Sequence, residues 1–430
     1  MIRNEVGTVK NILFSIFGLI YTKIFCLFSS DARKWNRNMN QNKLKHKDLY
    51  IQDDESCPCG SSMVYIDCCK FKQDAGPTEN EKPIEVLVGE LMRNMRKHSA
   101  ICIHPDKTRC KGDIKQAHAL QNHKIMNLLA EKTGHVYALN KSKQPLILSD
   151  DIYNPIVAIE VARVGVNKAT TEPCFCDYHD NIAFAAIEKG APDFDQNDEA
   201  MKFVYAYKAF AFEYFNFATL MKKFRELFAL RPSVFATKEQ VAYYRMLQLK
   251  EREFSLIKNH FDNELIAGTT TGITTCALEL PYQIRFANYA FIAPDFDLDG
   301  NCIEHTVNGV MHRIALTVFP EQSKSLILMS CLDSEQQIFD KLFSQVRSAP
   351  IDKVKYYFSL ILPLYSENVV LAPSLWESFN DKEKFAFFHM VNLFGPDSVR
   401  MSRCLSFAMQ NAKKKHDFDY SVRAGADLFC

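Results

Sequence analysis

The chain of 430 residues is 47% apolar and 24% charged, a composition typical of folded proteins and a length sufficient for two or three domains. Its net charge of +1 excludes a global electrostatic field that would attract nucleic acid or a membrane, so any basic surface must be local. Eight of its fourteen cysteines lie between residues 57 and 176, beside histidines. This clustering argues against a secreted disulfide protein and for metal binding in a reducing cytosol.

An apolar run at residues 11–29 has about the length that spans a bilayer, roughly 20 residues. Three interpretations remain open: a membrane anchor, a cleaved signal peptide, or a sequence upstream of the true start at Met39. Export would oxidise the clustered thiols, which disfavours the signal peptide. As an anchor, the run would tether the protein to the inner membrane with its body in the cytoplasm, because the basic residues after it outnumber Arg3 and Lys10 before it. Those that follow are Arg33, Lys34, Arg37, Lys43 and Lys45.

Residues 57–70 read CPCGSSMVYIDCCK and contain four cysteines, Cys57, Cys59, Cys68 and Cys69. Two short ligand pairs joined by a loop that folds back are what a closed four-thiolate zinc site requires. Pro58 stiffens the first pair, and the turn at residues 60–62 lets backbone amides approach the sulfurs. The alternative is four incidental thiols in a reducing compartment.

This segment resembles the SEC-C motif, a small zinc module first known from the C-terminus of the SecA ATPase and found in many bacterial proteins. The resemblance covers about fourteen residues and implies bound zinc. The lysines that follow the glycine in that family are replaced here by Met63 and Val64, and Asp67 lies further on. The positions that match the family pattern are Cys57, Pro58, Cys59, Gly60, Ser61, Tyr65, Cys68 and Cys69.

A second cysteine–histidine pattern follows an amphipathic helix predicted at residues 84–98. Cys102 and Cys110 form a knuckle-like pair, strands are predicted at 134–139 and 156–166, and Cys176 and His179 lie at a helix start. This is the order of a treble-clef zinc finger, and these four residues would form a closed zinc site. Cys174 could replace Cys176 as a ligand. The alternative is a pair of loops with free cysteines and a surface histidine.

A treble clef with a histidine between the two ligand pairs resembles the HNH, or His-Me finger, nucleases over residues 100–188. The resemblance implies that His118 is a general base that activates water for attack on phosphate. It also implies that Asn122 or His123 orients this base or holds Mg²⁺ or Mn²⁺. The sequence departs from the family because His179 is assigned to zinc, which leaves Asp180 as the remaining ligand of a catalytic metal. Alternatively, His118 packs against the zinc subdomain and hydrogen-bonds to the backbone.

Residues 175–180, FCDYHD, also resemble a segment of uncharacterised bacterial SEC-C proteins.

Further along, helices are predicted at 199–228 and 237–266, paired as an antiparallel hairpin whose stripe of Phe and Tyr side chains forms core. Residues 268–332 predict an antiparallel sheet of about four strands. The Asp-rich segment 295–301 is interpreted as a hairpin turn rather than a calcium loop, because position twelve is Thr306 and not a glutamate. Helices are predicted at 334–348, 352–362 and 373–394, and Lys413–Lys415 as a solvated basic face.

The sequence therefore predicts an α+β protein: two small N-terminal zinc modules followed by a helical hairpin, an antiparallel sheet and C-terminal helices. The expected units are 1–38, 39–76 (SEC-C module), 84–190 (treble clef), 199–266 (hairpin) and 268–430. Two functions remain open. One is a metal-dependent, HNH-like nuclease or nucleic-acid-binding protein in bacterial defence or stress, with His118 and Asn122 as catalytic residues. The other is a non-catalytic zinc adaptor that contacts proteins. Membrane contact is expected only if 11–29 is a real anchor.

Overall fold

The protein is described here by a computed structural model that covers residues 46–74, 100–141, 143, 146–147, 157–188, 190–393, 395–415, 418–421 and 425–430. The apolar run 11–29, Met39 and the predicted helix 84–98 lie outside these residues. Within the described ranges, no helix combines the length and the apolar character that a membrane crossing requires.

A seven-stranded sheet forms the centre of the molecule, in the order β5–β2–β13–β8–β11–β12–β7, and every neighbouring pair is antiparallel. Four of its strands come from the region 268–332, which confirms the predicted antiparallel sheet and the α+β class. Two further strands, β2 and β5, come from the region expected to form the treble clef. The strands are β2 (His135–Leu139), β5 (Val161–Gly165), β7 (Ile273–Leu280), β8 (Phe286–Ile292), β11 (Ile314–Pro320), β12 (Ser325–Leu332) and β13 (Val370–Leu371).

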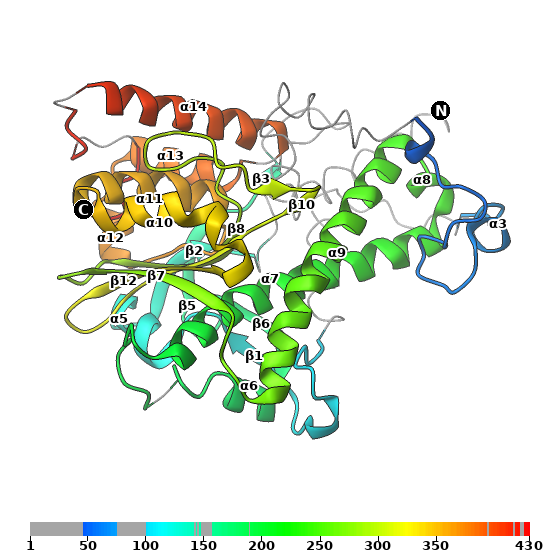
Figure 1. Cartoon of the computed structure of the whole chain (residues 1–430), viewed down its shortest axis with the longest axis horizontal. Helices are drawn as coiled ribbons and strands as arrows, with labels where there is room; N and C mark the ends of the chain where they lie inside the picture. The colour runs from blue at the N-terminus through cyan, green and yellow to red at the C-terminus, as the bar shows by residue number, and fades with distance from the viewer. Residues whose placement is uncertain are drawn as a thin grey trace.

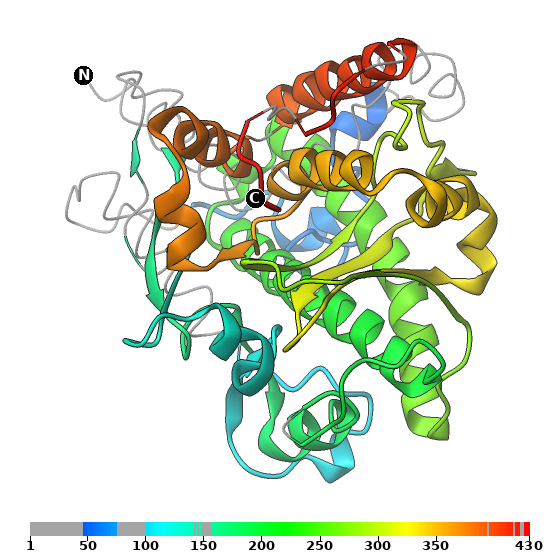
Figure 2. The same ribbon diagram turned by 90° about the vertical axis from the view of Figure 1, so that its left-hand side faces the viewer.

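Helices cover both faces of this sheet, because its central strands are apolar on both sides (Figures 1 and 2). Along β11, Ala315 and Phe319 belong to the core on the side of α7 (Glu199–Leu230), whereas Leu316 and Val318 belong to the opposite core. The helices that follow the sheet build that second core. They are α10 (Gln336–Ser348), α11 (Ile351–Tyr365), α12 (Pro373–Ser378), α13 (Asp381–Val391) and α14 (Gly395–Lys414).

Helix α7, the short α8 (Pro232–Phe235) and α9 (Lys238–Ala267) form a helical hairpin that we call the arm. The aromatic contacts Phe203–Phe261, Phe210–Phe254 and Phe224–Tyr243 run in opposite chain directions, so α7 and α9 are antiparallel. These buried rings confirm that the Phe/Tyr stripe is core. With 32 residues, α7 is about 48 Å long.

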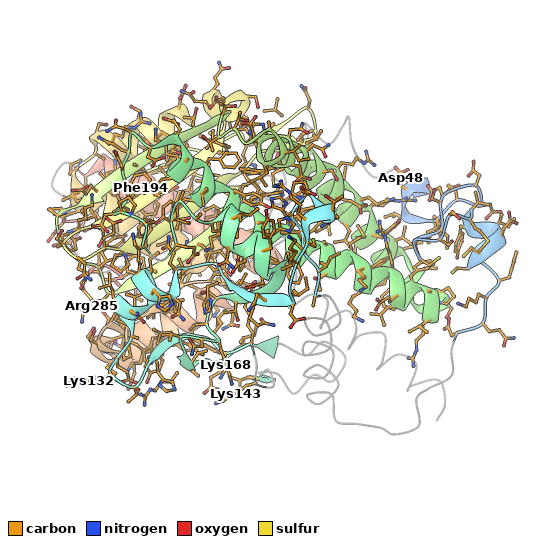
Figure 3. The ribbon with its side chains drawn as sticks, turned by 90° about the horizontal axis from the view of Figure 1, so that it is seen from below. Asp48, Lys132, Lys143, Lys168, Phe194 and Arg285 are labelled. Carbon is orange, nitrogen blue, oxygen red and sulfur yellow. The ribbon has the colours of Figure 1, made fainter. Side chains whose placement is uncertain are left out.

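Only part of the arm lies on the sheet. Near the start of α7, Tyr205 stacks on Phe319, and further along Phe212 contacts Tyr289. The rest of the hairpin projects away, and a module of residues 46–74 lies beyond α8 at its far end (Figure 1). Figure 3 shows Asp48 at this tip, on the opposite side of the molecule from Phe194. The module contains η2 (His46–Leu49) and α3 (Tyr65–Cys68).

A separate two-stranded ladder joins β1 (Ile114–His118) and β6 (Thr171–Cys176), and α6 (Asp177–Ala183) follows β6 directly. This pair, and not the predicted pair 134–139 and 156–166, lies beside the second cysteine group. The predicted pair does form, as β2–β5, but at the edge of the main sheet. The other short elements are β3 (Leu146–Ile147), β4 (Val157–Ala158), β9 (Thr306–Val307), β10 (Val310–Met311), η3 (Lys107–Arg109), η4 (Asn122–Met126), α5 (Asn127–Leu129) and η5 (Asp333–Glu335).

Candidate metal centres

Four cysteine sulfurs meet at the tip of the arm, those of Cys57, Cys59, Cys68 and Cys69, and all lie within 4.8 Å of one another. We call them the tip group. The Sγ atoms of Cys59 and Cys68 are 3.5 Å apart, and those of Cys68 and Cys69 are 3.7 Å apart. A disulfide would need about 2.05 Å. Four sulfurs around a zinc ion at about 2.3 Å would be separated by about 3.8 Å, so the tip group could hold a metal ion.

Local backbone geometry builds this group. Cys57 and Cys59 lie on a turn closed by the hydrogen bond from the Gly60 amide to the Cys57 carbonyl. Gly60 has a φ of +80°, which favours glycine. Cys68 ends α3 and Cys69 follows it, so the second ligand pair is set by one helical turn. The Ser61 hydroxyl lies 3.2 Å from the Cys68 sulfur, a contact that the sequence did not predict.

The thiols of Cys57, Cys59 and Cys69 have displaced pKa values. Burial raises the pKa of Cys57 to about 11 and also raises that of Cys69. Burial acts in the same direction on Cys59, but hydrogen bonds from Ser61 outweigh it and lower the pKa of Cys59 to about 7. Several buried thiolates repel one another unless a cation neutralises them. A cation bound at the tip group would offset this repulsion.

Contacts from both arm helices hold the tip module in place. The ring of Tyr65 meets the edge of Phe228 on α7. On α9, the Arg245 guanidinium donates to the carbonyl oxygens of Asp48 and Tyr50 and pairs with the Glu55 carboxylate at 2.7 Å. The tip group is thus fixed to the end of the arm and not to the sheet.

A second group of donors, the basal group, lies where the β1–β6 ladder meets α6. It consists of Cys102, Cys110, Cys176 and His179, whose ligand atoms also lie within 4.8 Å of one another. His179 Nδ1 is 3.2 Å from the sulfur of Cys176, 3.4 Å from that of Cys102 and 3.5 Å from that of Cys110. A tetrahedral zinc would place these atoms about 3.6 Å apart, so this group could also hold a metal ion.

Strand β6 brings the four residues of the basal group together. The Ile101 and Ile103 amides donate to the Pro173 and Cys174 carbonyls, which places Cys102 beside β6. Cys176 is the N-cap of α6, and His179 lies in the first turn of that helix. Cys110 follows η3, where the Asp106 carboxylate accepts the Thr108 amide as an N-cap.

Two neighbours of the basal group are informative. Cys174 is completely buried and lies outside the group, so Cys176 and not Cys174 is the converging residue. The His104 ring stacks on the His179 ring at 3.9 Å and 9°, a contact that sequence reasoning missed. Burial lowers the pKa of His179, and burial together with His179 lowers that of His104 to about 4. Both imidazoles are therefore neutral near pH 7, the state in which a histidine binds metal.

The predicted catalytic residues lie apart from both groups. His118 ends β1 opposite Thr171, and its Nε2 atom is buried with no hydrogen-bond partner. Burial, followed by the nearby Lys208, lowers the pKa of His118. Asn122 donates to the Asn167 side chain. Within the described residues, neither of the two donor groups includes His118, Asn122, His123 or Asp180.

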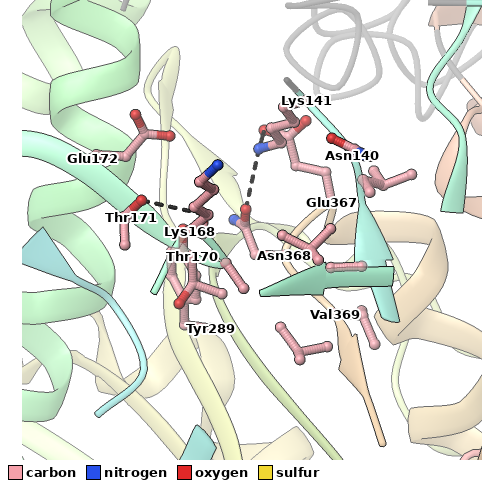
Figure 4. Close-up of a pocket in the computed structure, with 15 residues that line it drawn as sticks. Asn140, Lys141, Lys168, Thr170, Thr171, Glu172, Tyr289, Glu367, Asn368 and Val369 are labelled. Atoms are coloured by element: carbon pink, nitrogen blue, oxygen red, sulfur yellow. Dashed lines mark hydrogen bonds and ion pairs between the residues drawn. The ribbon is translucent and has the colours of Figure 1, made fainter. Parts of the chain in front are cut away.

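A cavity of about 50 Å³ opens between β2, β13 and the start of β6 (Figure 4). Its residues include Glu172, Lys168 and Tyr289, together with an ion pair of 3.1 Å between Lys141 and Glu367. Neither His118 nor Asn122 lines it. The predicted base is therefore not a lining residue of this cavity, although Thr171, which lies opposite it in the ladder, is.

Comparison of the chain with protein-family models, with curated proteins and with solved structures finds no match.

Proposed function

We propose that this protein is a non-catalytic adaptor in which two zinc ions fix two small modules at opposite ends of the helical arm. The tip group would be a zinc module of the SEC-C type, and the basal group a treble-clef-like zinc site. The observation that carries the proposal is the donor set. Each group supplies four sulfur or imidazole donors within 4.8 Å of one another. Four protein ligands complete the coordination of zinc, which is typical of structural rather than catalytic sites.

Burial and position support the same function. In the tip group Cys57 and Cys69 are buried, and in the basal group Cys102, Cys176 and His179 are buried. Zinc would replace thiol protons there and relieve the repulsion between thiolates. A module held on a projecting arm is available for contact with another protein, which is the role of an adaptor.

Metal analysis of the full chain tests this proposal. We expect about two zinc ions per chain in protein purified without chelator. The double variant Cys57→Ser/Cys69→Ser should retain one ion, and Cys102→Ser/Cys176→Ser should also retain one. Cys302→Ser and Cys404→Ser, at exposed positions outside both groups, serve as controls and should retain both ions. A folded wild-type protein without zinc contradicts the proposal.

An HNH-like nuclease is the second candidate, and one observation favours it. Strand β6 leads directly into α6, and His118 is the last residue of β1, the strand paired with β6, so a strand pair and a helix lie together beside the basal group. The burial of His118 Nε2 argues against it, because a general base must come within about 3 Å of the proton that it removes.

Cleavage assays separate the two candidates. Wild-type protein and His118→Ala are incubated with Mg²⁺ or Mn²⁺ and with duplex DNA, single-stranded DNA or RNA. The adaptor function predicts no cleavage above that of a blank preparation. Cleavage that is present in the wild type and lost in His118→Ala, with zinc content unchanged, would favour the nuclease instead.

A further inference from the structure

We infer that the tip module docks a partner segment that combines basic and apolar side chains. The inference deepens the proposed adaptor function and rests on it, because it names the chemistry of the partner. It also places the docking face on a particular part of the molecule: the outer surface of residues 46–74, which lies at the far end of the arm from the sheet (Figures 1 and 3).

The first observation is apolar surface on a very small unit. Within 29 residues, Met63, Ile66 and Phe71 are 49%, 39% and 78% exposed. Tyr65, in contrast, is buried against Phe228 of the arm. The module therefore packs Tyr65 and Ile51 on the core and leaves Met63, Ile66 and Phe71, together with Tyr50 at 40%, exposed to solvent. Clustered apolar side chains on a surface typically mark a site of protein contact.

The second observation is the sign of the charge. Residues 46–74 contain six carboxylates and three lysines, and Arg245 of the arm pairs with Glu55, which leaves 6 − 3 − 1 = 2 excess negative charges. The lysines of the outer surface are engaged: Lys70 pairs with Asp53 at 2.6 Å, and Lys72 donates to the Ala229 carbonyl at 2.6 Å. Within the described residues, Asp54 and Asp67 are exposed and have no ion-pair or hydrogen-bond partner. Negative charge thus remains beside the apolar side chains.

The backbone keeps these features together. The Ile66 amide donates to the Asp53 carbonyl, and the Tyr65 amide donates to the Glu55 carbonyl. These bonds hold α3 against residues 53–55, so Asp54 lies near the helix that carries Ile66 and Asp67. Met63 is tied to the same unit because its carbonyl accepts the Cys57 amide.

Charge complementarity selects the occupant. A partner segment with lysine or arginine would approach Asp54 and Asp67 favourably, while its apolar side chains covered Ile66 and Phe71. Nucleic acid and acidic membranes would instead be repelled by the excess carboxylates. An amphipathic helix with a basic face and an apolar face meets both requirements.

Fluorescence anisotropy on the full, zinc-loaded chain tests the inference. Three labelled 18-residue helical peptides share the same leucine positions and carry lysine, glutamine or glutamate at all other positions. We expect the lysine peptide to bind at least tenfold more tightly than the glutamine peptide and the glutamate peptide not to bind. Raising the salt concentration should weaken the lysine complex. Equal binding of the three peptides, or no binding of the lysine peptide, overturns the inference.

Variants locate the binding face. Ile66→Ser/Phe71→Ser should weaken binding of the lysine peptide at least tenfold, and Asp54→Lys/Asp67→Lys should shift the preference toward the glutamate peptide. Leu256→Ser and Glu377→Lys change an exposed apolar and an exposed acidic residue elsewhere and serve as matched controls. Unchanged binding in both tip variants overturns the inference.

Zinc content measured on the same samples separates this inference from the adaptor proposal. A protein that holds two zinc ions but binds no peptide would contradict the docking inference and leave the zinc-module proposal unaffected. If Ile66→Ser/Phe71→Ser loses zinc, Met63→Ser gives a second test of the apolar face, and full peptide affinity in that variant would count against it.

Discussion

At the scale of single residues, the carboxylates of the Asp-rich turn at 295–301 form hydrogen bonds and ion pairs that stabilise the fold. Asp297 accepts the backbone amides of Asp299 and Asn301, and the Phe296–Cys302 bridge closes the turn. The predicted hairpin turn is therefore confirmed. Asp299 in turn pairs with Lys353 and Lys413, which joins the turn to α11 and α14.

Gly300 in this turn allows a sharp test. It has a φ of +74°, and a Cβ atom there would overlap the Ser406 carbonyl oxygen and lie 2.8 Å from the Gln410 amide nitrogen on α14. Gly134 has nearly the same φ, +72°, but a Cβ there would meet nothing within 4 Å. Gly134→Ala should cost about 1 kcal/mol of unfolding free energy from backbone strain alone. Gly300→Ala should cost about 3 kcal/mol, because α14 must also move.

Urea denaturation of both variants measures the difference. Since the backbone strain is nearly the same at the two positions, the extra loss in Gly300→Ala reports the contact with α14 alone. Equal losses of unfolding free energy in the two variants would mean that α14 moves away from the added Cβ atom with no measurable loss of stability.

Sequence reasoning identified the residues of both donor groups because the ligands of each pair are close in the chain. Cys176 and His179 are three residues apart and share one helical turn, so their convergence is local. His104 could not be placed in the same way, since it reaches His179 only after the segment of Cys102 has paired with β6. In the sequence, this contact was indicated only by the position of His104 between Cys102 and Cys110.

At the scale of elements, pairing between distant segments forms a strand that the local sequence pattern does not predict. Strand β1 reads IKQAH and has little of the β-branched, alternating character that predicts a strand. It forms because β6 lies opposite, and the two strands are more than fifty residues apart in the chain. Helices α7 and α9, in contrast, follow from their own length and periodicity, and their predicted limits were within two residues of those observed.

Arg245 of α9 makes several of the contacts that attach the tip module to the arm. Arg245 binds the carbonyls of Asp48 and Tyr50 as well as the Glu55 carboxylate. Arg245→Ala should therefore loosen residues 46–56 while the sheet and its helices stay folded. We expect amide hydrogens in that segment to exchange about tenfold faster, which corresponds to a loss of about 1.4 kcal/mol in local stability.

Hydrogen exchange followed by mass spectrometry checks this, with Arg252→Ala as the control because Arg252 is exposed on the same helix. Faster exchange in β11 or β12 as well would show that the module and the sheet unfold together, contrary to this expectation.

At the scale of the whole molecule, one sheet combines strands from distant parts of the chain. The short β13 joins β2 to β8: Leu371 lies opposite Tyr137 of β2, and Val370 and Leu371 lie opposite Ala287 and Phe286 of β8. A two-residue strand has no periodic pattern, so the sequence could not predict that the region 134–165 continues the sheet of 268–332. The predicted division at residues 190 and 268 remains a prediction.

The two donor groups should contribute unequally to the stability of the whole molecule. Both groups border the same apolar core. Cys102 and Cys176 lie in the part of it that contains Phe175, Phe184 and Tyr207, whereas Cys57 and Cys69 lie at the far end of the arm. Cys102→Ser/Cys176→Ser should therefore lower the free energy of global unfolding by more than about 4 kcal/mol, as the loss of a metal from a core does. Cys57→Ser/Cys69→Ser should leave the main thermal transition nearly unshifted and unfold only residues 46–74. Calorimetry of both variants, with and without a chelator, measures this difference. Equal shifts would show that the arm transmits the loss at its tip to the sheet.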